Sequence, residues 1–227
     1  MLIDAVGTLL KPAPGVAEIY AEAARRQGVE LDRATVKARF ADHFGAVEED
    51  DLRGLLVTDE STERRRWRRI VSQVLPEVAD RDRAFEELWD YFGRPAAWGL
   101  FDDVAPSMAL LHAQGWPVRI ASNFDGRLRG VLAGLPPLAP WAESAVISSE
   151  VGFRKPHPAF FQEACARLGL PPERVLFVGD DVENDYRGPL REGLRAALVD
   201  REGALPGDVP SYPSLLQLVA EVLRFES

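Results

Sequence analysis

The spacing of hydrophobic positions divides the chain into two kinds of sequence. The chain opens on the apolar run 1–3, which Asp4 follows at once. This run is shorter than the roughly four to eight residues of a typical buried strand, so a short strand and a start inside a longer natural run both fit. From about residue 14 to residue 94, apolar side chains recur at the i, i+3, i+4, i+7 spacing of amphipathic helices. We therefore expect a helical insert over residues 14–94, within a core made of residues 1–13 and 95–227.

Four helices are expected within the insert. Their apolar positions are Val16, Ile19, Tyr20 and Ala23; Val36, Phe40 and Phe44; Trp67, Ile70, Val71 and Val74; and Phe85, Leu88, Trp89 and Phe92. The pattern predicts that the second helix begins near Asp32, that the third stops at Pro76, and that the fourth stops at Gly93.

After the insert, strand-like runs alternate with helical runs. The strand-like runs are residues 116–121, 145–148, 174–178 and 196–199. We expect one helix to start at Pro158 and stop before Gly169, a break at residues 188–189 followed by a short helix, and a closing helix over residues 215–223. This alternation predicts an α/β fold with a doubly wound parallel sheet. Ligands of such sheets bind at the carboxyl ends of the strands.

Polar side chains follow four of the strand-like runs, at the point where each run ends. They are Asp4; Ser122 and Asn123; Lys155; and Asp180, Asp181 and Asp185. Each of them alone also fits an ordinary role, such as a helix-capping Asp, a Ser-Asn turn, a solvated lysine or an acidic loop. Because parallel strands end at one edge of a sheet, the whole set indicates a single site.

Composition and charge limit the classes of partner. The chain has 36 acidic and 27 basic residues and a formal net charge of −9, which is a poor basis for nucleic-acid binding and suits cation binding. Its one cysteine, Cys165, excludes an intrachain disulfide and fits a reducing compartment. No apolar run approaches the length of about 18 residues that a membrane span needs. We expect a cytoplasmic protein with no nucleic-acid and no membrane partner.

One basic cluster stands out, the run Arg64–Arg69. On a helix its arginines spread over several faces, while Trp67 joins the apolar stripe. We favour a solvated helix for this run, with capture of an anion over the site as the second interpretation and nucleic-acid binding as the third.

The motifs at the strand ends resemble those of the haloacid dehalogenase-like hydrolase superfamily. The matching segments are residues 3–9, 121–123, 155–156 and 179–185. The resemblance implies that the helical insert is a cap over the core domain. It also implies that Asp4 is a nucleophile that forms a covalent aspartyl intermediate.

The resemblance implies roles for the neighbours of Asp4. Thr8 would steady the loop by a hydrogen bond, and Ser122 would donate to a substrate oxyanion in a pocket that Asn123 helps to shape. Lys155 would pair with Asp4 and with the negative charge of the substrate. Together with Asp4, these four residues form the expected catalytic set.

A divalent cation is the expected cofactor. Clustered carboxylates cannot all stay ionised without compensation, and Mg²⁺ needs only a few carboxylate ligands. The resemblance implies ligation of Mg²⁺ by Asp4, by the backbone carbonyl of Val6 and by Asp180, with Asp185 bound directly or through water. The role of Asp181 stays open.

One position departs from the pattern of the family's phosphatases. They carry a second Asp two residues after the nucleophile, which protonates the leaving group and then activates water; this chain has Val6 there. Loss of a general acid–base costs about 10²–10⁴-fold in rate, or roughly 3–5 kcal/mol. We therefore expect only slow turnover, or turnover restricted to substrates with good leaving groups.

Three functional hypotheses follow. The first is a Mg²⁺-dependent phosphoester hydrolase that acts on a small phosphorylated or otherwise anionic molecule. The second is a non-catalytic protein that binds a metal or a phosphorylated ligand. The third is a 2-haloacid dehalogenase, because those enzymes also lack the second Asp. Their last motif, however, lacks the Gly-Asp acidic pair, whereas this chain has Asp180 and Asp185 there. The sequence does not specify an oligomeric state.

Overall fold

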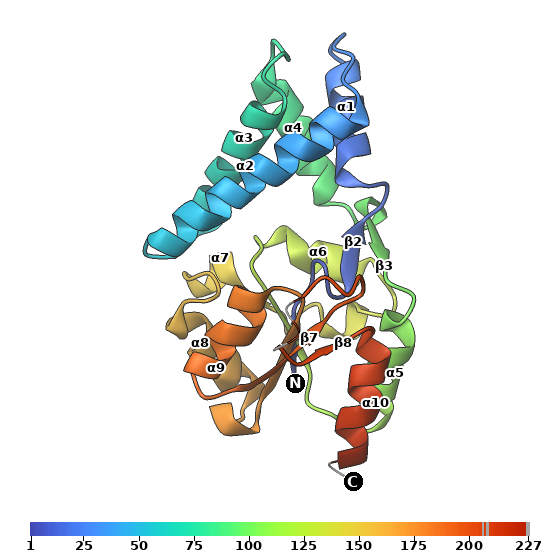
Figure 1. Ribbon diagram of the computed structural model, residues 1–227, viewed down its shortest axis with the longest axis vertical. Helices are drawn as coiled ribbons and strands as arrows, with labels where there is room; N and C mark the ends of the chain where they lie inside the picture. Colours follow the sequence, from blue (N-terminus) through green and yellow to red (C-terminus); the bar gives the residue numbers. More distant parts are fainter. Residues whose placement is uncertain (206, 208, 226–227) are drawn as a thin grey trace.

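The protein combines a parallel sheet flanked by helices with a group of four further helices (Figure 1). The computed structural model describes residues 1–205, 207 and 209–225. The strands of the main sheet are β1 (Leu2–Ile3), β4 (Arg119–Ser122), β5 (Val146–Ile147), β6 (Leu176–Gly179), β7 (Arg195–Val199) and β8 (Ser211–Tyr212). They pair in parallel in the order β5-β4-β1-β6-β7-β8. The predicted α/β fold with a parallel sheet is confirmed.

The two-residue strand β1 lies near the middle of the sheet and is completely buried. Leu2 of β1 packs into the same apolar cluster as Phe161 and Phe177, whereas Ile3 packs into the cluster on the other face. This alternation is the period of a strand, and burial on both faces accounts for the lack of any polar residue within β1. Asp4 is the first polar residue after it.

Helices cover both faces of the sheet. On one face lie α5 (Val104–Ala113), α6 (Arg127–Ala133) and α10 (Leu215–Phe225), and on the other lies α8 (Pro158–Leu168), with α9 (Gly188–Arg191) beside it (Figure 1). Shorter elements are η1 (Pro95–Ala97), η2 (Ala139–Trp141), α7 (Ser148–Val151), η3 (Pro172–Arg174) and the π-helical turn η4 (Val182–Arg187). No helix in the described part of the chain is long and apolar enough to cross a membrane.

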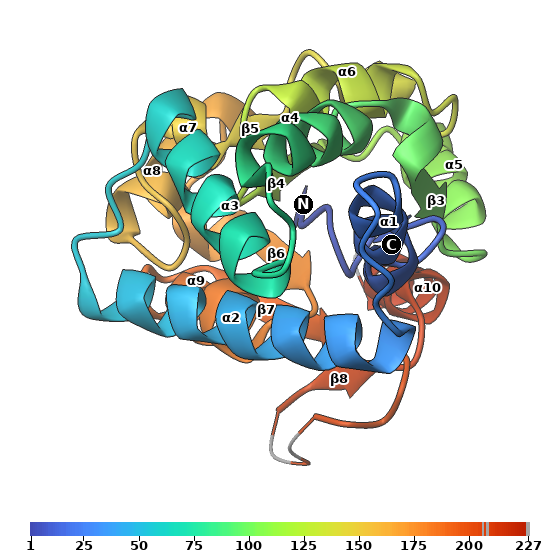
Figure 2. The same ribbon diagram turned by 90° about the horizontal axis from the view of Figure 1, so that it is seen from above.

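The four further helices, which we call the helical unit, are α1 (Val16–Arg25), α2 (Arg33–Arg53), α3 (Glu60–Val74) and α4 (Arg81–Phe92). They lie above the sheet, as Figures 1 and 2 show, and they share an apolar cluster of their own. The side chains of Asp32, Asp59 and Asp80 accept hydrogen bonds from backbone N–H groups in the first turns of α2, α3 and α4. The predicted start at Asp32 is therefore correct. The division into domains at residues 14 and 94 stays a prediction.

A second, two-stranded sheet was not predicted. It pairs β2 (Leu10–Pro12) with β3 (Trp98–Leu100) in antiparallel register. These strands carry the chain into and out of the helical unit, so the two connections run side by side (Figure 1). The sequence pattern missed them because each is three residues long and pairs only across a separation of almost ninety residues.

The structure also corrects three local predictions. Gly188 and Pro189 do not break a helix; they begin α9, because proline is tolerated in a first turn. Ser148 begins α7 instead of ending a strand. Helix α5 was missed because Ser107 interrupts its apolar pattern; the Ser107 hydroxyl donates to the Asp103 carbonyl oxygen at 2.5 Å.

The single cysteine provides a test of the packing of α8. Cys165 is 4% exposed, and burial raises the pKa of its thiol to about 11. We predict that the native protein reacts slowly with a thiol-specific disulfide reagent at pH 8, and that the reaction becomes fast and stoichiometric in denaturant. Rapid complete labelling of the native protein would show that α8 is not packed as described.

Candidate active site

The turn that follows β1 places Asp4 in the centre of the sheet edge. The Asp4 backbone N–H donates to the Val178 carbonyl oxygen on β6 at 2.8 Å, and the side chain is almost completely buried. Gly7 has a φ of +92°, and any side chain at this position would run into the Asp180 carboxylate. Glycine is therefore required for the turn to approach Asp180 so closely.

Lys155 is the positive charge of the site. Its Nζ lies 2.7 Å from Asp4 Oδ1 and 2.6 Å from Asp185 Oδ1, and it also donates to the Ala121 carbonyl oxygen at 3.4 Å. All three of these side chains are buried. The ammonium group thus joins two carboxylates that come from opposite ends of the chain.

Asn123 holds the backbone of Lys155 in place. Its Nδ2 donates to the Lys155 carbonyl oxygen at 3.1 Å, and its Oδ1 accepts from the Lys155 N–H at 2.7 Å. With both polar atoms engaged in this way, Asn123 is a positioning residue. Its neighbour Ser122 is buried at the end of β4 and lines the cavity above Asp4.

Asp180 and Asp185 have different surroundings. Asp180 Oδ1 accepts from the Thr8 hydroxyl at 2.8 Å, which links the first and last motifs. Asp185 Oδ2 accepts from the backbone N–H groups of Asp180 and Asp181 at 3.2 and 3.1 Å, while its Oδ1 is bound by Lys155. Both oxygens of Asp185 are therefore engaged.

The role of Asp181, which the sequence left open, is structural. Asp181 Oδ1 accepts from the N–H groups of Glu183 and Asn184 at 2.9 and 2.7 Å. It caps the π-helical turn η4, the element that carries Asp185. Such turns are rare and are frequently found at functional sites.

The carboxylates at the centre carry more negative charge than Lys155 can balance. Single oxygens of Asp4, Asp180 and Asp185 lie within 4.8 Å of one another. Burial, together with the charges of Asp4 and Asp185, raises the pKa of Asp180 to about 8. Burial also raises the pKa of Asp185. Burial alone would lower the pKa of Lys155, but Asp185 and Asp4 outweigh it and raise that pKa above its usual value.

The donor set fits a hard divalent cation. Mg²⁺ prefers oxygen ligands and needs one or two carboxylates, with water or substrate oxygens completing its coordination. Asp180 Oδ2 accepts no hydrogen bond from the described residues, and Asp4 Oδ1 accepts from Lys155 alone among them, so each keeps a lone pair for a cation. A dication between them would compensate the excess negative charge of the cluster.

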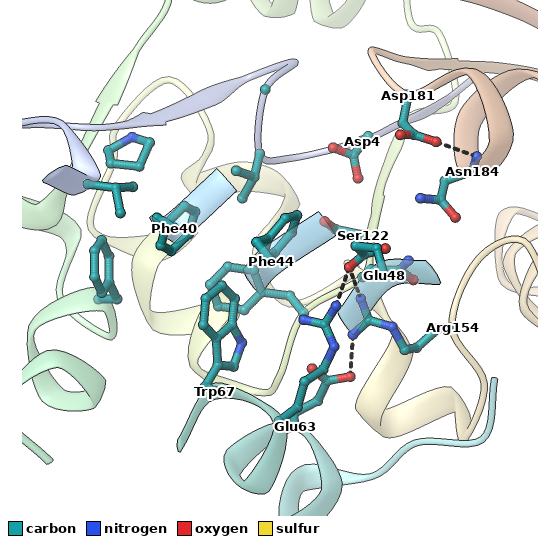
Figure 3. A pocket seen from close by; sticks show the side chains of 18 of the residues that line it. Asp4, Phe40, Phe44, Glu48, Glu63, Trp67, Ser122, Arg154, Asp181 and Asn184 are labelled. Atoms are coloured by element: carbon teal, nitrogen blue, oxygen red, sulfur yellow. Dashed lines mark hydrogen bonds and ion pairs between the residues drawn. The ribbon is translucent and has the colours of Figure 1, made fainter. Parts of the chain in front are cut away.

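A cavity of about 490 Å³ lies between the helical unit and the edge of the sheet (Figure 3). Asp4, Val6, Ser122 and Lys155 line its lower end. Eleven of the other lining residues are apolar or aromatic side chains of the helical unit. Ligand sites typically combine such an apolar wall with a few convergent polar groups.

A buried cluster of charges beside this cavity was not predicted. Arg154 donates to Glu63 at 2.5 Å and to Glu48 at 3.1 Å; both acids belong to the helical unit (Figure 3). Arg66 of α3 pairs with Asp51 at 2.8 Å and also with Glu48. The prediction of a solvated helix for Arg64–Arg69 is therefore wrong for Arg66, which is 8% exposed. No local pattern reveals these pairs, because the partners are far apart in sequence.

Further contacts fasten the helical unit to the loops of the sheet. Glu60 Oε1, at the start of α3, accepts from the Gly126 N–H at 2.8 Å and from the Ser149 hydroxyl at 2.5 Å. The backbone N–H of Thr58 donates a hydrogen bond to the Gly152 carbonyl oxygen at 3.0 Å. The helical unit thus closes over the carboxyl ends of the strands.

The chain is similar to several known proteins in sequence and in fold. A human relative, haloacid dehalogenase-like hydrolase domain-containing protein 3, is 29% identical over 201 residues, which cover 86% of this chain and 79% of the relative. A phosphoserine phosphatase of Thermus thermophilus is 29% identical over 234 residues, covering 95% and 93% of the two chains. The structure of the HAD-hydrolase YfnB from Bacillus subtilis, bound to magnesium, has a TM-score of 0.80 at 19% identity and covers 98% of this chain and 97% of YfnB.

The family assignment rests on the sequence itself. The pattern of the family described as haloacid dehalogenase-like hydrolase matches residues 1–191, which include Asp4, Ser122, Lys155, Asp180 and Asp185. The chain therefore belongs to the haloacid dehalogenase-like hydrolase family.

Proposed function

We propose that the protein is a slow, Mg²⁺-dependent phosphoester hydrolase in which Asp4 is the nucleophile. The observation that carries the proposal is the asymmetry of the Asp4 carboxylate. Lys155 holds Oδ1 at 2.7 Å, whereas Oδ2 accepts no hydrogen bond from the described residues, and Asp4 lines the cavity. A held carboxylate with one unengaged oxygen is pre-organised for attack. The phosphatases among the relatives support this reaction class.

The proposed reaction has two steps. The Asp4 carboxylate attacks phosphorus, the bond from phosphorus to the leaving oxygen breaks, and a phosphoaspartyl group forms. Water then attacks that phosphorus, which breaks its bond to Asp4 and releases inorganic phosphate and the free carboxylate. Lys155 and the Ser122 hydroxyl are placed to stabilise the negative charge on the phosphoryl oxygens.

The cation that we propose is held by Asp4, Asp180 and the carbonyl oxygen of Val6. Its positive charge would compensate the negative charge of the phosphoryl oxygens. Because both oxygens of Asp185 are engaged, we assign Asp185 to holding Lys155 and the loop after β6, with contact to the cation through water. Thr8 fixes the rotamer of Asp180.

Val6 sets the expected rate. Its side chain lines the cavity beside Asp4 but can neither donate nor accept a proton. The leaving oxygen must therefore take its proton from water, which favours substrates with good leaving groups. We further propose that the residues 14–94 act as the cap domain of a cytoplasmic enzyme.

Haloacid hydrolysis is the second candidate function, and Val6 is the observation that favours it. Halide leaves without a proton, so this reaction does not need the missing acid. Release of chloride from 2-chloropropionate in the absence of metal, with no phosphate release from aryl phosphates, would establish it in place of the phosphatase.

The first prediction concerns Asp4. We expect phosphate release from 4-nitrophenyl phosphate in millimolar Mg²⁺, and a loss of at least about 1,000-fold in kcat for Asp4→Asn, which removes the nucleophile. The exposed Asp102→Asn is the matched control and should keep the wild-type rate. Equal rates for Asp4→Asn and wild type would contradict the proposal.

The second prediction concerns the missing acid. Val6→Asp should raise kcat on an alkyl phosphate by at least about tenfold, because general acid catalysis contributes about 10²–10⁴-fold. Val6→Asn is similar in size but cannot supply the proton, and should not raise the rate. An increase that is the same for both variants would refute the explanation.

The third prediction concerns removal of the metal. In EDTA, the pKa of Asp180 is higher in the folded protein than in the unfolded chain. Between pH about 4 and about 8, the folded protein therefore binds a proton at Asp180 that the unfolded chain does not bind. The free energy of unfolding of the wild type should therefore fall from pH 5 to pH 8, by at least about 1.4 kcal/mol more than that of Asp180→Asn. Saturating Mg²⁺ should abolish the difference in slope. If the free energy of unfolding, measured by denaturant titration, has the same pH dependence in the wild type and in Asp180→Asn, the excess of negative charge at the carboxylate cluster is contradicted.

A further inference from the structure

The cavity above Asp4 is unusually rich in aromatic side chains. Nine aromatic residues line it, in a chain that has 11 Phe, 5 Trp and 4 Tyr in total. They come chiefly from the helical unit, where Phe40 and Phe44 stack with their ring centroids 5.6 Å apart and Trp67 lies 6.0 Å from Phe44. Figure 3 shows these three rings gathered on one side of the pocket, with Asp4 and Ser122 toward the other side.

The cavity offers no free positive charge away from Asp4. Of the described residues that line it, four are cationic, namely Arg66, Arg127, Arg154 and Lys155. Each one is already in an ion pair. The cluster of Arg66 and Arg154 contains one more carboxylate than guanidinium groups, because Glu48, Asp51 and Glu63 surround it. A second anionic group on a ligand would find no unpaired cation there and would face net negative charge.

We propose that the substrates are phosphate monoesters of bulky, uncharged aromatic or polycyclic alcohols, whose apolar body fills the chamber lined by Phe40, Phe44 and Trp67. This inference rests on the proposed phosphatase function and adds the class of substrate to it. The phosphoryl group occupies the polar end, at Asp4 and Lys155, and the organic group occupies the aromatic end. Small polar phosphates with a carboxylate or a second phosphate are poor ligands.

The size of the effect follows from the buried area. An aromatic group of the size of a Phe or Trp side chain buries about 150–250 Å² of surface, and apolar burial on this scale is the main favourable term in ligand binding. We expect an advantage in Kd of at least about 100-fold for a bicyclic aromatic ligand over a one-carbon ligand that has the same anionic head.

The test measures binding, so that it does not depend on turnover. Affinities of orthophosphate, methylphosphonate, (1-naphthylmethyl)phosphonate and 2-amino-3-phosphonopropionate are determined by calorimetry in Mg²⁺ with the full chain. The naphthyl compound should bind at least about 100-fold more tightly than methylphosphonate, and the amino acid compound no more tightly than methylphosphonate. A naphthyl affinity equal to that of methylphosphonate, or a preference for the amino acid compound, overturns the inference.

The same series separates the two claims. Binding of orthophosphate and methylphosphonate without a naphthyl advantage leaves the phosphate site intact and overturns only the substrate class. Absence of binding by all four compounds overturns the proposed function and this inference together. A naphthyl advantage without hydrolysis of 1-naphthyl phosphate, an aryl ester with a good leaving group, supports the aromatic chamber and overturns the phosphatase.

Variants locate the aromatic contact. Phe44→Ala should weaken binding of the naphthyl compound by at least about tenfold and leave methylphosphonate unchanged, because only the aromatic end of the cavity is altered. Leu55→Ala is the control, since Leu55 is 81% exposed and does not line the cavity. If Phe44→Ala does not fold, Phe44→Leu keeps the apolar volume and removes the ring. An unchanged naphthyl affinity in the folded variant overturns the assignment.

Discussion

The contact between the Lys155 ammonium group and the carboxylates of Asp4 and Asp185 is the interaction on which the site depends. A buried carboxylate is costly unless it is paired, and this one lysine pairs two of them. Within the described part of the chain, the third carboxylate, Asp180, accepts a hydrogen bond only from the Thr8 hydroxyl. The site therefore carries an excess of negative charge, which the divalent cation that we propose would compensate.

Contacts to the main sheet and to the helical unit hold the loop that carries Lys155 in position. Asn123 binds the backbone of Lys155, and the neighbouring Arg154 reaches into the helical unit to pair with Glu63 and Glu48. The loop that carries Lys155 thus connects the charged centre with the helices that roof the cavity. Adjacent residues of one loop thus contact the charged centre at the sheet edge and the helical unit above it.

Much of this arrangement could be predicted from sequence, because it follows from short-range patterns. The periods of 3.6 and 2 residues identify most helices and strands, and polar residues at strand ends identify Asp4, Ser122 and Asp180. The pairs that were missed are long-range. The sequence near Arg66 does not show that this residue is buried and paired with Asp51 and Glu48. Likewise, the pairing of β2 with β3 joins segments that are far apart in sequence. The aromatic residues of the helical unit that line the cavity also belong to ordinary apolar stripes in the sequence. A stripe does not show which of its side chains pack against a neighbouring helix and which face a cavity.

The most direct test of the account is a crystal structure of the protein with Mg²⁺ and beryllium fluoride, which imitates a phosphoryl group bound to a carboxylate. We expect beryllium bonded to an Asp4 carboxylate oxygen and a magnesium ion in contact with Asp4 and Asp180. We also expect that Lys155 still lies between Asp4 and Asp185, as it does without the ligand. Beryllium fluoride bound elsewhere, or a magnesium ion that does not touch Asp4 and Asp180, would contradict it.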